Sequence, residues 1–232
     1  MIPGPPRAPA PRGAGPPAPI PEPDCPLCPR LLAFRQAQRD AHPGWFNAPV
    51  PSFGTTEASL LIVGLAPGLK GANRTGRPFT GDFAGDLLYR TLGKFGFAEG
   101  CYAARPDDGL ALRGVRITNA VRCVPPHNKP EPGEIAACRP FLIAEIAAMP
   151  RLRAIVALGA IAHHAVLVAL GLPRSRFPFA HGRVHVLPDG PWLADSYHCS
   201  RYNTNTGRLT AAMFEAVFAT LAPRLEEAEG GR

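Results

Sequence analysis

The segment Ser59–Pro67, "SLLIVGLAP", decides the fold class of this chain. It is a short apolar run that ends in Gly and Pro, which is typical of a strand buried inside a parallel sheet. Asp82 then precedes the helical pattern "FAGDLLYRTLGKFG", whose leucines share one side, and Asp82 is a candidate N-cap. A buried strand, a loop and a helix in this order predict an α/β fold.

The same unit recurs along the chain. Further strands are expected over 115–123 and 152–159, and helices over 134–149 and 161–170, with Pro140 bending the first of these helices or marking its first turn. "RVHVLP" and "WLADSYH" predict a hairpin or a fourth strand near the sheet edge, and a last helix follows Thr206. Loops after Val63, Thr118 and Tyr197 should therefore meet at the carboxyl ends of the strands, where such folds bind ligands.

The composition favours one globular domain with a polyanionic partner. The chain has 232 residues and a net charge of +7, which favours nucleic acid first. Only three of the 25 basic residues are lysine, so a GC-rich genome explains the arginine excess equally well. No apolar run approaches the roughly 20 residues of a membrane span, and the N-terminus lacks the apolar core of a signal peptide. We therefore expect a cytoplasmic protein without a membrane partner.

The two ends of the chain are expected to lie outside the folded domain. Residues 1–24 contain ten prolines and three glycines, a composition typical of a disordered or polyproline-like tail. The folded domain is then expected over 25–222, and a flexible C-terminal tail over 223–232. We further expect the domain to be a monomer.

Four cysteines form a candidate metal site. Cys25 and Cys28 are spaced C-x2-C, and Cys123 and Cys138 are separated by fourteen residues. Two close and two remote thiolates can complete a tetrahedral four-sulfur site, which suits zinc or an iron–sulfur cluster. The alternative is a set of unrelated buried thiols, although the prolines beside Cys25 are unusual for one.

The loop Gly64–Asp82, "GLAPGLKGANRTGRPFTGD", raises the question of its ligand. It is rich in glycine and carries Lys70, Arg74 and Arg77, which suits phosphate or nucleic acid. It contains neither GxGxxG nor GxxxxGK[ST], and this counts against a nucleotide-binding metabolic enzyme.

Taken together, "GLAPG", "NRTGRPFTGD", "ITNAVRC", the four cysteines and "HCSRYNTNTGRLT" resemble bacterial and archaeal uracil-DNA glycosylases with a [4Fe-4S] cluster, the family-5 (type b) group in particular. The resemblance covers about Asp24 to Leu221. It implies a three-layer α/β/α sandwich around a four-stranded parallel sheet. It also implies a monofunctional hydrolase of DNA base-excision repair that removes uracil, and other deaminated bases such as hypoxanthine, from double-stranded DNA in the nucleoid. The cluster ligands that it implies are Cys25, Cys28, Cys123 and Cys138.

The resemblance also assigns roles in the base pocket. Cleavage of the C1′–N1 bond needs a flipped base, a ring to stack on it, a reader for its polar edge and a donor for the departing anion. By motif position these are Phe79, Asn119 and His198. A core phenylalanine and a turn-capping asparagine are the competing interpretations, and a lone histidine is weak evidence. The pocket floor is expected to consist of backbone at Gly64, Leu65 and Ala66.

Leu65 stands where many relatives carry a polar or acidic residue, and a family-4 glycosylase would carry Glu there. The resemblance moves the candidate acid to Asp82, which is expected to orient water or stabilise the cationic sugar. A plain N-cap is the alternative role for Asp82, and both roles can hold together. The presence of Asp82, Asn119 and His198 argues against a non-catalytic iron–sulfur DNA-binding protein.

The DNA contacts are expected to come from two positively charged loops. The second loop resembles the segment that enters the minor groove, where Tyr202 could fill the vacated stack. Cys199 replaces the proline that usually follows the motif histidine, so this loop is expected to be less rigid. The predicted DNA-binding residues are Arg74, Arg77, Ser200, Arg201, Tyr202, Asn203 and Arg208.

Overall fold

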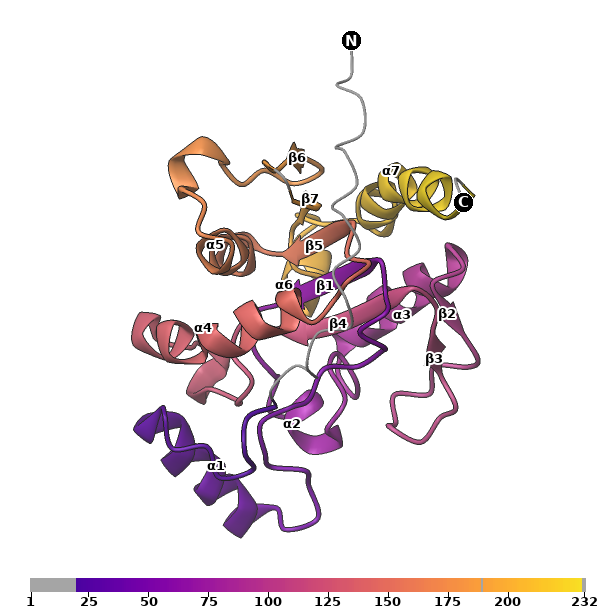
Figure 1. Ribbon diagram of the computed structural model, residues 1–232. Helices are drawn as coiled ribbons and strands as arrows, with labels where there is room; N and C mark the ends of the chain where they lie inside the picture. The colour runs from indigo at the N-terminus through magenta and orange to yellow at the C-terminus, as the bar shows by residue number, and fades with distance from the viewer. Residues whose placement is uncertain (1–19, 189, 231–232) are drawn as a thin grey trace.

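The computed structural model describes residues 20–188 and 190–230 and centres on one five-stranded sheet (Figure 1). The strand order is β4-β1-β5-β7-β6, and every pair is parallel except β6 with β7. A separate antiparallel pair, β2 and β3, lies beside α3 (Figure 1). The strands are β1 (Leu60–Gly64), β2 (Ala98–Glu99), β3 (Ala111–Leu112), β4 (Val115–Asn119), β5 (Ala154–Leu158), β6 (Val184–Val186) and β7 (Trp192–Ser196).

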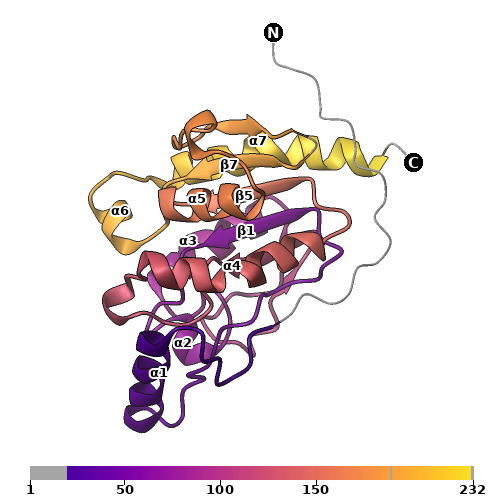
Figure 2. The same cartoon turned by 60° about the vertical axis from the view of Figure 1, so that its left-hand side comes forward.

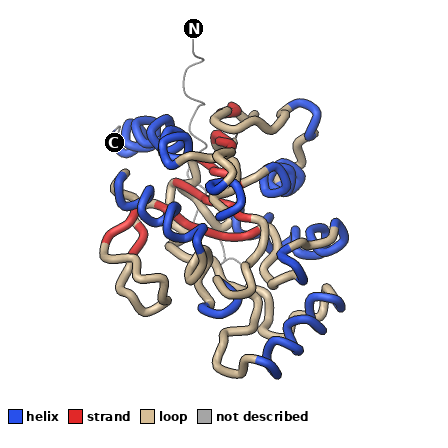
Figure 3. Tube along the Cα trace, turned by 180° about the vertical axis from the view of Figure 1, so that it is seen from behind, coloured by secondary structure: helices blue, strands red, loops and turns tan. Residues whose placement is uncertain are grey.

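Helices cover both faces of the sheet, as Figure 3 shows from behind. Because side chains alternate along a strand, Leu60 and Ile62 pack on one side with α3 (Phe83–Lys94) and α7 (Ala211–Gly230). Leu61 and Val63 pack on the other side with α4 (Pro132–Ala147) and α5 (Ala160–Ala169). The predicted three-layer α/β/α architecture is therefore confirmed.

The remaining helices lie mainly at one end of the molecule. In Figure 2, α1 (Pro29–Ala41) and α6 (Arg201–Asn205) lie on the left, and the C-terminal end of α7 lies on the right. The short helix α2 (Ala72–Thr75) belongs to the loop after β1, and two 3-10 turns complete the set, η1 (Pro126–Asn128) and η2 (Arg174–Arg176). Within the described ranges, no helix combines the length and apolar character that a membrane crossing requires.

The sheet has one strand more than the resemblance implied. The hairpin expected from "RVHVLP" and "WLADSYH" is present, with β7 inside the parallel sheet and β6 at its edge. Pro140 lies in the interior of α4, whose first turn holds Pro132 instead, so the first-turn alternative for Pro140 is wrong.

The boundaries of the folded part also differ from the expectation. Helix α7 begins at Ala211 and continues through Gly230 with Pro223 inside it, and Leu225 is buried in the core, beyond the predicted end of the folded range at residue 222. At the other end, the Cys25 amide donates to Glu22 O and Arg39 pairs with Asp24, so folded contacts begin before Cys25. The rest of the predicted N-terminal tail, 1–19, lies outside the described residues.

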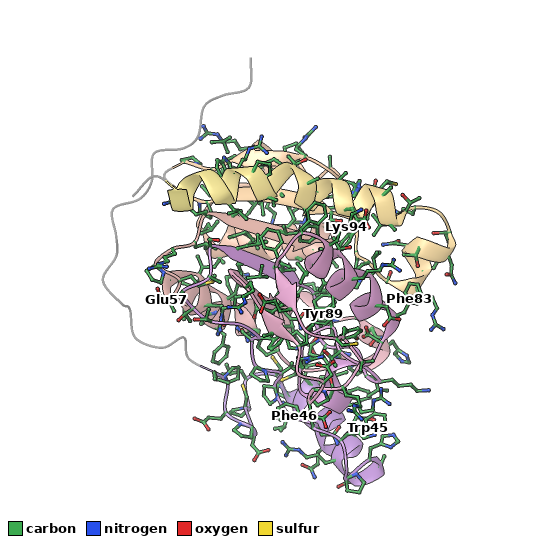
Figure 4. The ribbon with its side chains drawn as sticks, turned by 90° about the vertical axis from the view of Figure 1, so that its right-hand side faces the viewer. Trp45, Phe46, Glu57, Phe83, Tyr89 and Lys94 are labelled. Carbon is green, nitrogen blue, oxygen red and sulfur yellow. The ribbon has the colours of Figure 1, made fainter. Side chains whose placement is uncertain are left out.

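Helix α3 links the core to the loop after β1. Asp82 is its N-cap and accepts from the Ala84 amide, as predicted. Figure 4 shows Lys94 just below α7, where it forms an ion pair with Glu215 at 2.6 Å. Gly85 faces the preceding loop so closely that an added Cβ would lie 1.9 Å from Phe79 O. The helix can therefore approach this loop only where it has no side chain.

Two glycines of α3 provide a matched test of this packing. Gly93 has open space around it, so Gly93→Ala should stabilise the protein by about 0.5–1 kcal/mol through helix propensity alone. Gly85→Ala should instead destabilise it by about 1–3 kcal/mol, because the backbone of Phe79 must move. Denaturant unfolding of both variants measures the difference. Equal effects at the two positions would contradict the close packing.

Candidate active site

The carboxyl ends of three parallel strands bring the predicted loops together. Gly64 ends β1 and Asn119 ends β4, and the two residues are direct partners in the parallel register. β7 ends at Ser196, two residues before His198. The ring of Phe79, from the loop after β1, lies 5.9 Å from the His198 ring with 30° between their planes. Gly64, Phe79, Asn119 and His198 thus form one cluster, which we call the pocket cluster.

The centre of the pocket cluster requires a glycine. A Cβ at Gly64 would lie 2.3 Å from Asn119 Oδ1 and 2.7 Å from Phe79 Cζ. Asn119 is 3% exposed, and its Oδ1 has no hydrogen-bond partner within the described part of the chain. A buried amide oxygen without a partner costs free energy, so this one is suited to a ligand that donates an N–H.

Phe79 has an unusual backbone conformation. Its φ is 52°, in the left-handed region that bulky residues rarely adopt, and its side chain is 7% exposed. Such conformations persist only where the surroundings impose them, and they concentrate at functional sites. The ring contacts the pocket cluster and also belongs to the hydrophobic core beneath α3, so the core interpretation and the pocket interpretation of Phe79 hold together.

His198 is a neutral hydrogen-bond donor in this setting. Burial lowers the pKa of His198 to about 4, so the imidazole carries one N–H near neutral pH. Its loop is held by Asn203, whose Nδ2 donates to His198 O at 2.8 Å, and Ser200 caps α6. Cys199, the next residue, is buried in the core, where burial and the charge of Asp82 raise the pKa of its thiol.

The two carboxylate oxygens of Asp82 lie in different surroundings. Oδ1 accepts from the Ala84 amide at 3.2 Å, which is the cap. Oδ2 lies against the loop after β1, because a Cβ at Gly71 would be 2.2 Å from it and one at Gly68 would be 2.9 Å from it. Burial raises the pKa of Asp82. The N-cap alternative is thus real, and it leaves one oxygen beside the loop that carries the pocket floor.

Most of the predicted DNA-binding residues lie at the surface. Arg74, Arg201 and Arg208 are exposed, and Tyr202 is 72% exposed. Arg201 lies over the Phe83 ring at 5.4 Å, and Arg208 lies over the Tyr197 ring at 4.6 Å. Ser200 and Asn203 are half-buried and hold the loop, as described above, and of the pocket floor Leu65 and Ala66 are half-buried as well.

Arg77 does not fit the predicted role in DNA binding. Its side chain is buried and forms a bidentate ion pair with Asp108, with N···O distances of 2.8 and 2.7 Å. The guanidinium also lies over the rings of Phe53 and Tyr89 at 5.2 and 5.5 Å. Its hydrogen bond and charge lower the pKa of Asp108. Arg77 stabilises the loops around the site instead of facing solvent.

The four predicted ligand cysteines converge. They line one pocket between α1, α4 and the loop after β4, together with Leu31 and Phe141. Within the described residues, no three of these sulfurs lie within 4.8 Å of one another. A single tetrahedral zinc ion would hold its sulfurs about 3.8 Å apart, given Zn–S bonds of about 2.3 Å. Four cysteine sulfurs around one pocket can close on either a zinc ion or an iron–sulfur cluster.

Two donors already point at these sulfurs. Arg35 Nη1 donates to Cys123 Sγ at 3.0 Å, and the Arg122 amide donates to Cys138 Sγ at 3.3 Å. Burial raises the pKa of the Cys123 thiol to about 12, so a cationic group would be needed to hold it as thiolate. Ala66 of the predicted pocket floor packs against the hydrophobic cluster that contains Cys123 and Cys138, which connects the two sites. Cys101 and Cys199 lie outside this pocket.

A second group of potential ligands is occupied by hydrogen bonds. His163, His185 and Asp195 place one ligand atom each within 4.8 Å, and all three are largely buried. His163 Nδ1 lies 2.6 Å from Asp195 Oδ1, and His163 Nε2 lies 2.8 Å from the Phe177 carbonyl oxygen. Both ring nitrogens of His163 are thus already engaged with oxygen atoms of the protein, and the group ties α5 to β7.

Comparison with known proteins agrees with this geometry. A family profile described as "Uracil DNA glycosylase superfamily" matches residues 51–222. The chain belongs to this superfamily. Its glycosylases are hydrolases, and the chain is therefore a hydrolase.

Individual relatives distinguish the subgroups. A type-5 uracil-DNA glycosylase from Thermus thermophilus is 49% identical over 195 residues, which cover 82% of this chain and 89% of the relative. One from Mycobacterium bovis is 43% identical over 205 residues, covering 84% and 75%. A type-4 enzyme from Pyrobaculum aerophilum is 37% identical over only 123 residues, covering 53% and 55%. The extent of the matches agrees with the type-5 resemblance and disfavours the type-4 alternative.

Several residues of this uracil-DNA glycosylase homologue contact the two sites but were not predicted from the sequence. Tyr102 and Asp108 lie between β2 and β3 and contact the loop of Phe79 and Arg77 respectively. Arg35 of α1 reaches the cysteine pocket. None of them belongs to a recognisable motif, and their partners are distant in sequence; only the clustering of Tyr and Asp in a glycine-bounded loop could have drawn attention to them.

The low pKa of His198 predicts a specific pH dependence of stability. The unfolded chain protonates this histidine below about pH 6.5, whereas the folded protein resists protonation down to about pH 4. The contribution of His198 is therefore fully present above pH 6.5 and is lost as the pH falls toward 4. Denaturant unfolding between pH 7.5 and 4.5 should show a steeper loss for the wild type than for His198→Asn.

His127→Asn, at an exposed position outside the pocket cluster, is the matched control substitution. Parallel curves for the wild type and His198→Asn would show that His198 titrates normally.

Proposed function

We propose that this protein excises uracil from double-stranded DNA by binding the flipped base in the pocket cluster. The observation that carries the proposal is the buried Asn119 Oδ1, which has no hydrogen-bond partner in the described chain. It lies beside Gly64, whose missing side chain allows β1, the end of β4 and the Phe79 ring to come together. Uracil presents an N–H next to a carbonyl oxygen. The Asn119 amide can accept from the first and donate to the second.

The neighbouring side chains supply the remaining interactions. The Phe79 ring stacks on the flipped base, which offsets part of the few kcal/mol lost on unstacking it from DNA. The neutral His198 donates to uracil O2. This hydrogen bond strengthens as negative charge develops on the departing base, and such preorganised donors contribute about 3–4 kcal/mol.

Asp82 acts at the sugar in this proposal. Cleavage leaves positive charge on the deoxyribose, and a carboxylate close by stabilises that charge or orients the water that attacks C1′. Oδ1 is engaged in capping α3, so Oδ2, which faces the loop of Gly68 and Gly71, is the oxygen available for this role. Leu65 supplies no polar side chain at the position that other subgroups use.

The same chemistry extends to hypoxanthine. Its six-membered ring presents an N–H beside a carbonyl oxygen, the same pair that Asn119 reads in uracil. A site that relies on stacking and one amide, without a strong general base, tolerates a larger ring system.

The duplex would lie across the exposed Arg74, Arg201 and Arg208, with Tyr202 entering the stack that the base leaves. We place the enzyme in the nucleoid of the cytoplasm and expect it to act as a monomer.

Release of bases from defined duplexes tests this function. The wild type should produce alkali-labile sites in duplexes holding one uracil or one hypoxanthine, and none in an undamaged duplex. Asp82→Asn keeps the cap oxygen, so its stability should stay close to wild type, while the rate falls by about 100-fold or more through loss of the charge.

Asp86→Asn is the matched control, because Asp86 is an exposed acid in the same helical turn. It should retain the wild-type rate. Absence of base release from every lesion would overturn the enzyme function, and near-full activity of folded Asp82→Asn would overturn the role of Asp82 alone.

We also propose that Cys25, Cys28, Cys123 and Cys138 hold a [4Fe-4S] cluster. The support is their convergence on one pocket, the two N–H donors directed at their sulfurs, and the resemblance to uracil-DNA glycosylases that hold such a cluster. The cluster's contribution would be structural: it would join α1, α4 and the loop after β4 behind the pocket floor.

Replacement of one ligand tests the cluster. In Cys138→Ala, the iron content per chain should fall close to zero, and Tm should fall by about 5–10 °C because metal binding stabilises only the folded state. Cys101→Ala should keep both values, since Cys101 is exposed and lies outside the pocket. Zinc in place of iron in the wild type, measured by elemental analysis, would refute the cluster.

A further inference from the structure

We propose that Tyr102 is a positioning residue for the base pocket: its hydroxyl holds the backbone of Phe79 in the left-handed conformation and so orients the ring for the flipped base. The inference rests on the stacking role proposed for Phe79. Tyr102 lies between β2 and β3, outside every motif identified in the sequence, and it acts through Phe79 without contacting the base.

Phe79 needs such a restraint. At a φ of 52° a residue with a side chain is destabilised relative to the ordinary helical or extended regions, and an aromatic residue gains nothing locally in return. Gly76 and Gly81, on either side, adopt positive φ without this penalty. The conformation of Phe79 is therefore imposed by contacts from elsewhere in the chain.

The Tyr102 hydroxyl provides two of these contacts. It donates to Phe79 O at 3.2 Å and lies 3.3 Å from the Gly81 amide, from which it accepts. One hydroxyl thus bridges both ends of the turn that reverses the chain after Phe79. The hydroxyl of Tyr89, from α3, donates to Pro78 O at 2.6 Å and fixes the preceding peptide.

The surrounding contacts hold Tyr102 in place. Its ring lies 4.6 Å from the ring of Tyr89, which Figure 4 labels in the interior of the molecule, and 5.8 Å from the guanidinium of Arg77. Asp108, which pairs with that guanidinium, also accepts from the Ala103 amide at 2.9 Å. The buried Arg77–Asp108 ion pair therefore connects Ala103, which follows Tyr102, with the loop of Phe79, to which Arg77 belongs.

The position of Gly85 agrees with this arrangement. A Cβ there would lie 1.9 Å from Phe79 O and 2.3 Å from the Tyr102 hydroxyl. Helix α3 thus has no side chain at Gly85, and the Phe79 carbonyl group and the Tyr102 hydroxyl occupy the space that a side chain there would need. Burial raises the pKa of Tyr102 to about 12, so the hydroxyl keeps its proton at neutral pH.

A double-mutant cycle tests the positioning role. Tyr102→Phe removes the hydroxyl and keeps the ring. We expect it to slow single-turnover release of uracil by about tenfold, since two hydrogen bonds are lost. In a Phe79→Ala background the same change should have no further effect, because there is no ring left to orient. Affinity for a duplex with an abasic-site analogue, which places no base in the pocket, should stay unchanged.

Leu110→Ala is the matched control, as Leu110 is buried in the same segment but lies outside the hydroxyl's contacts. Its effect on the rate should be the same with Phe79 present or absent. The proposal is overturned if Tyr102→Phe leaves the rate unchanged, slows both backgrounds equally, or weakens binding to the abasic duplex to the same degree.

Failure of the proposed function looks different, because the wild type itself would then release no base. In that case hydrogen exchange of the Gly81 amide still tests whether the Tyr102 hydroxyl binds this turn. Exchange should be faster in Tyr102→Phe than in the wild type, and equal rates would refute the hydrogen bond.

Discussion

The close approach of three elements at Gly64 is the constraint on which the site depends. The parallel register places Gly64 opposite Asn119, and the ring of Phe79 takes the space that any side chain at residue 64 would need. The amide oxygen of Asn119 is sealed from solvent by this contact and is left for a ligand. The pocket is thus shaped by backbone proximity, and the polar groups in it are few but desolvated, which would strengthen each interaction they make with a ligand.

Two features of this arrangement cost free energy, one in the pocket and one in the loops that support it. A left-handed phenylalanine is unfavourable, and burying Arg77 with Asp108 is stabilising only if both charges are well paired. Asp108 meets this condition with four hydrogen bonds: two to the guanidinium and one each to the amides of Ala103 and Leu110. The rigid loop that results carries the strain at Phe79, as expected where a structure is organised for function.

The sequence predicted the fold well because its strands are continuous apolar runs. Gly64 and Asn119 could be identified as site residues because each ends one of those strands. Arg77 was misplaced for a physical reason. A basic residue in a glycine-rich loop is typically solvated, and only Asp108, 31 positions away, reverses that expectation. Tyr102 lies in a connection without periodicity, so no local pattern could indicate its contact with Phe79. Helix α7 continues past Pro223, where the sequence pattern predicted the folded range to end, and Leu225 beyond it is buried in the core.

The cysteine pocket and the base pocket share one piece of backbone. Asn119 and Cys123 are four residues apart on the same loop, and the amides of Ala120 and Val121 donate to the carbonyl groups of Gly64 and Leu65. Ala66 packs against the hydrophobic cluster that contains Cys123 and Cys138. A group bound by these sulfurs would therefore fix the pocket floor from behind without taking part in the reaction. A structural role of this kind would be compatible with a hydrolysis that needs no electron transfer.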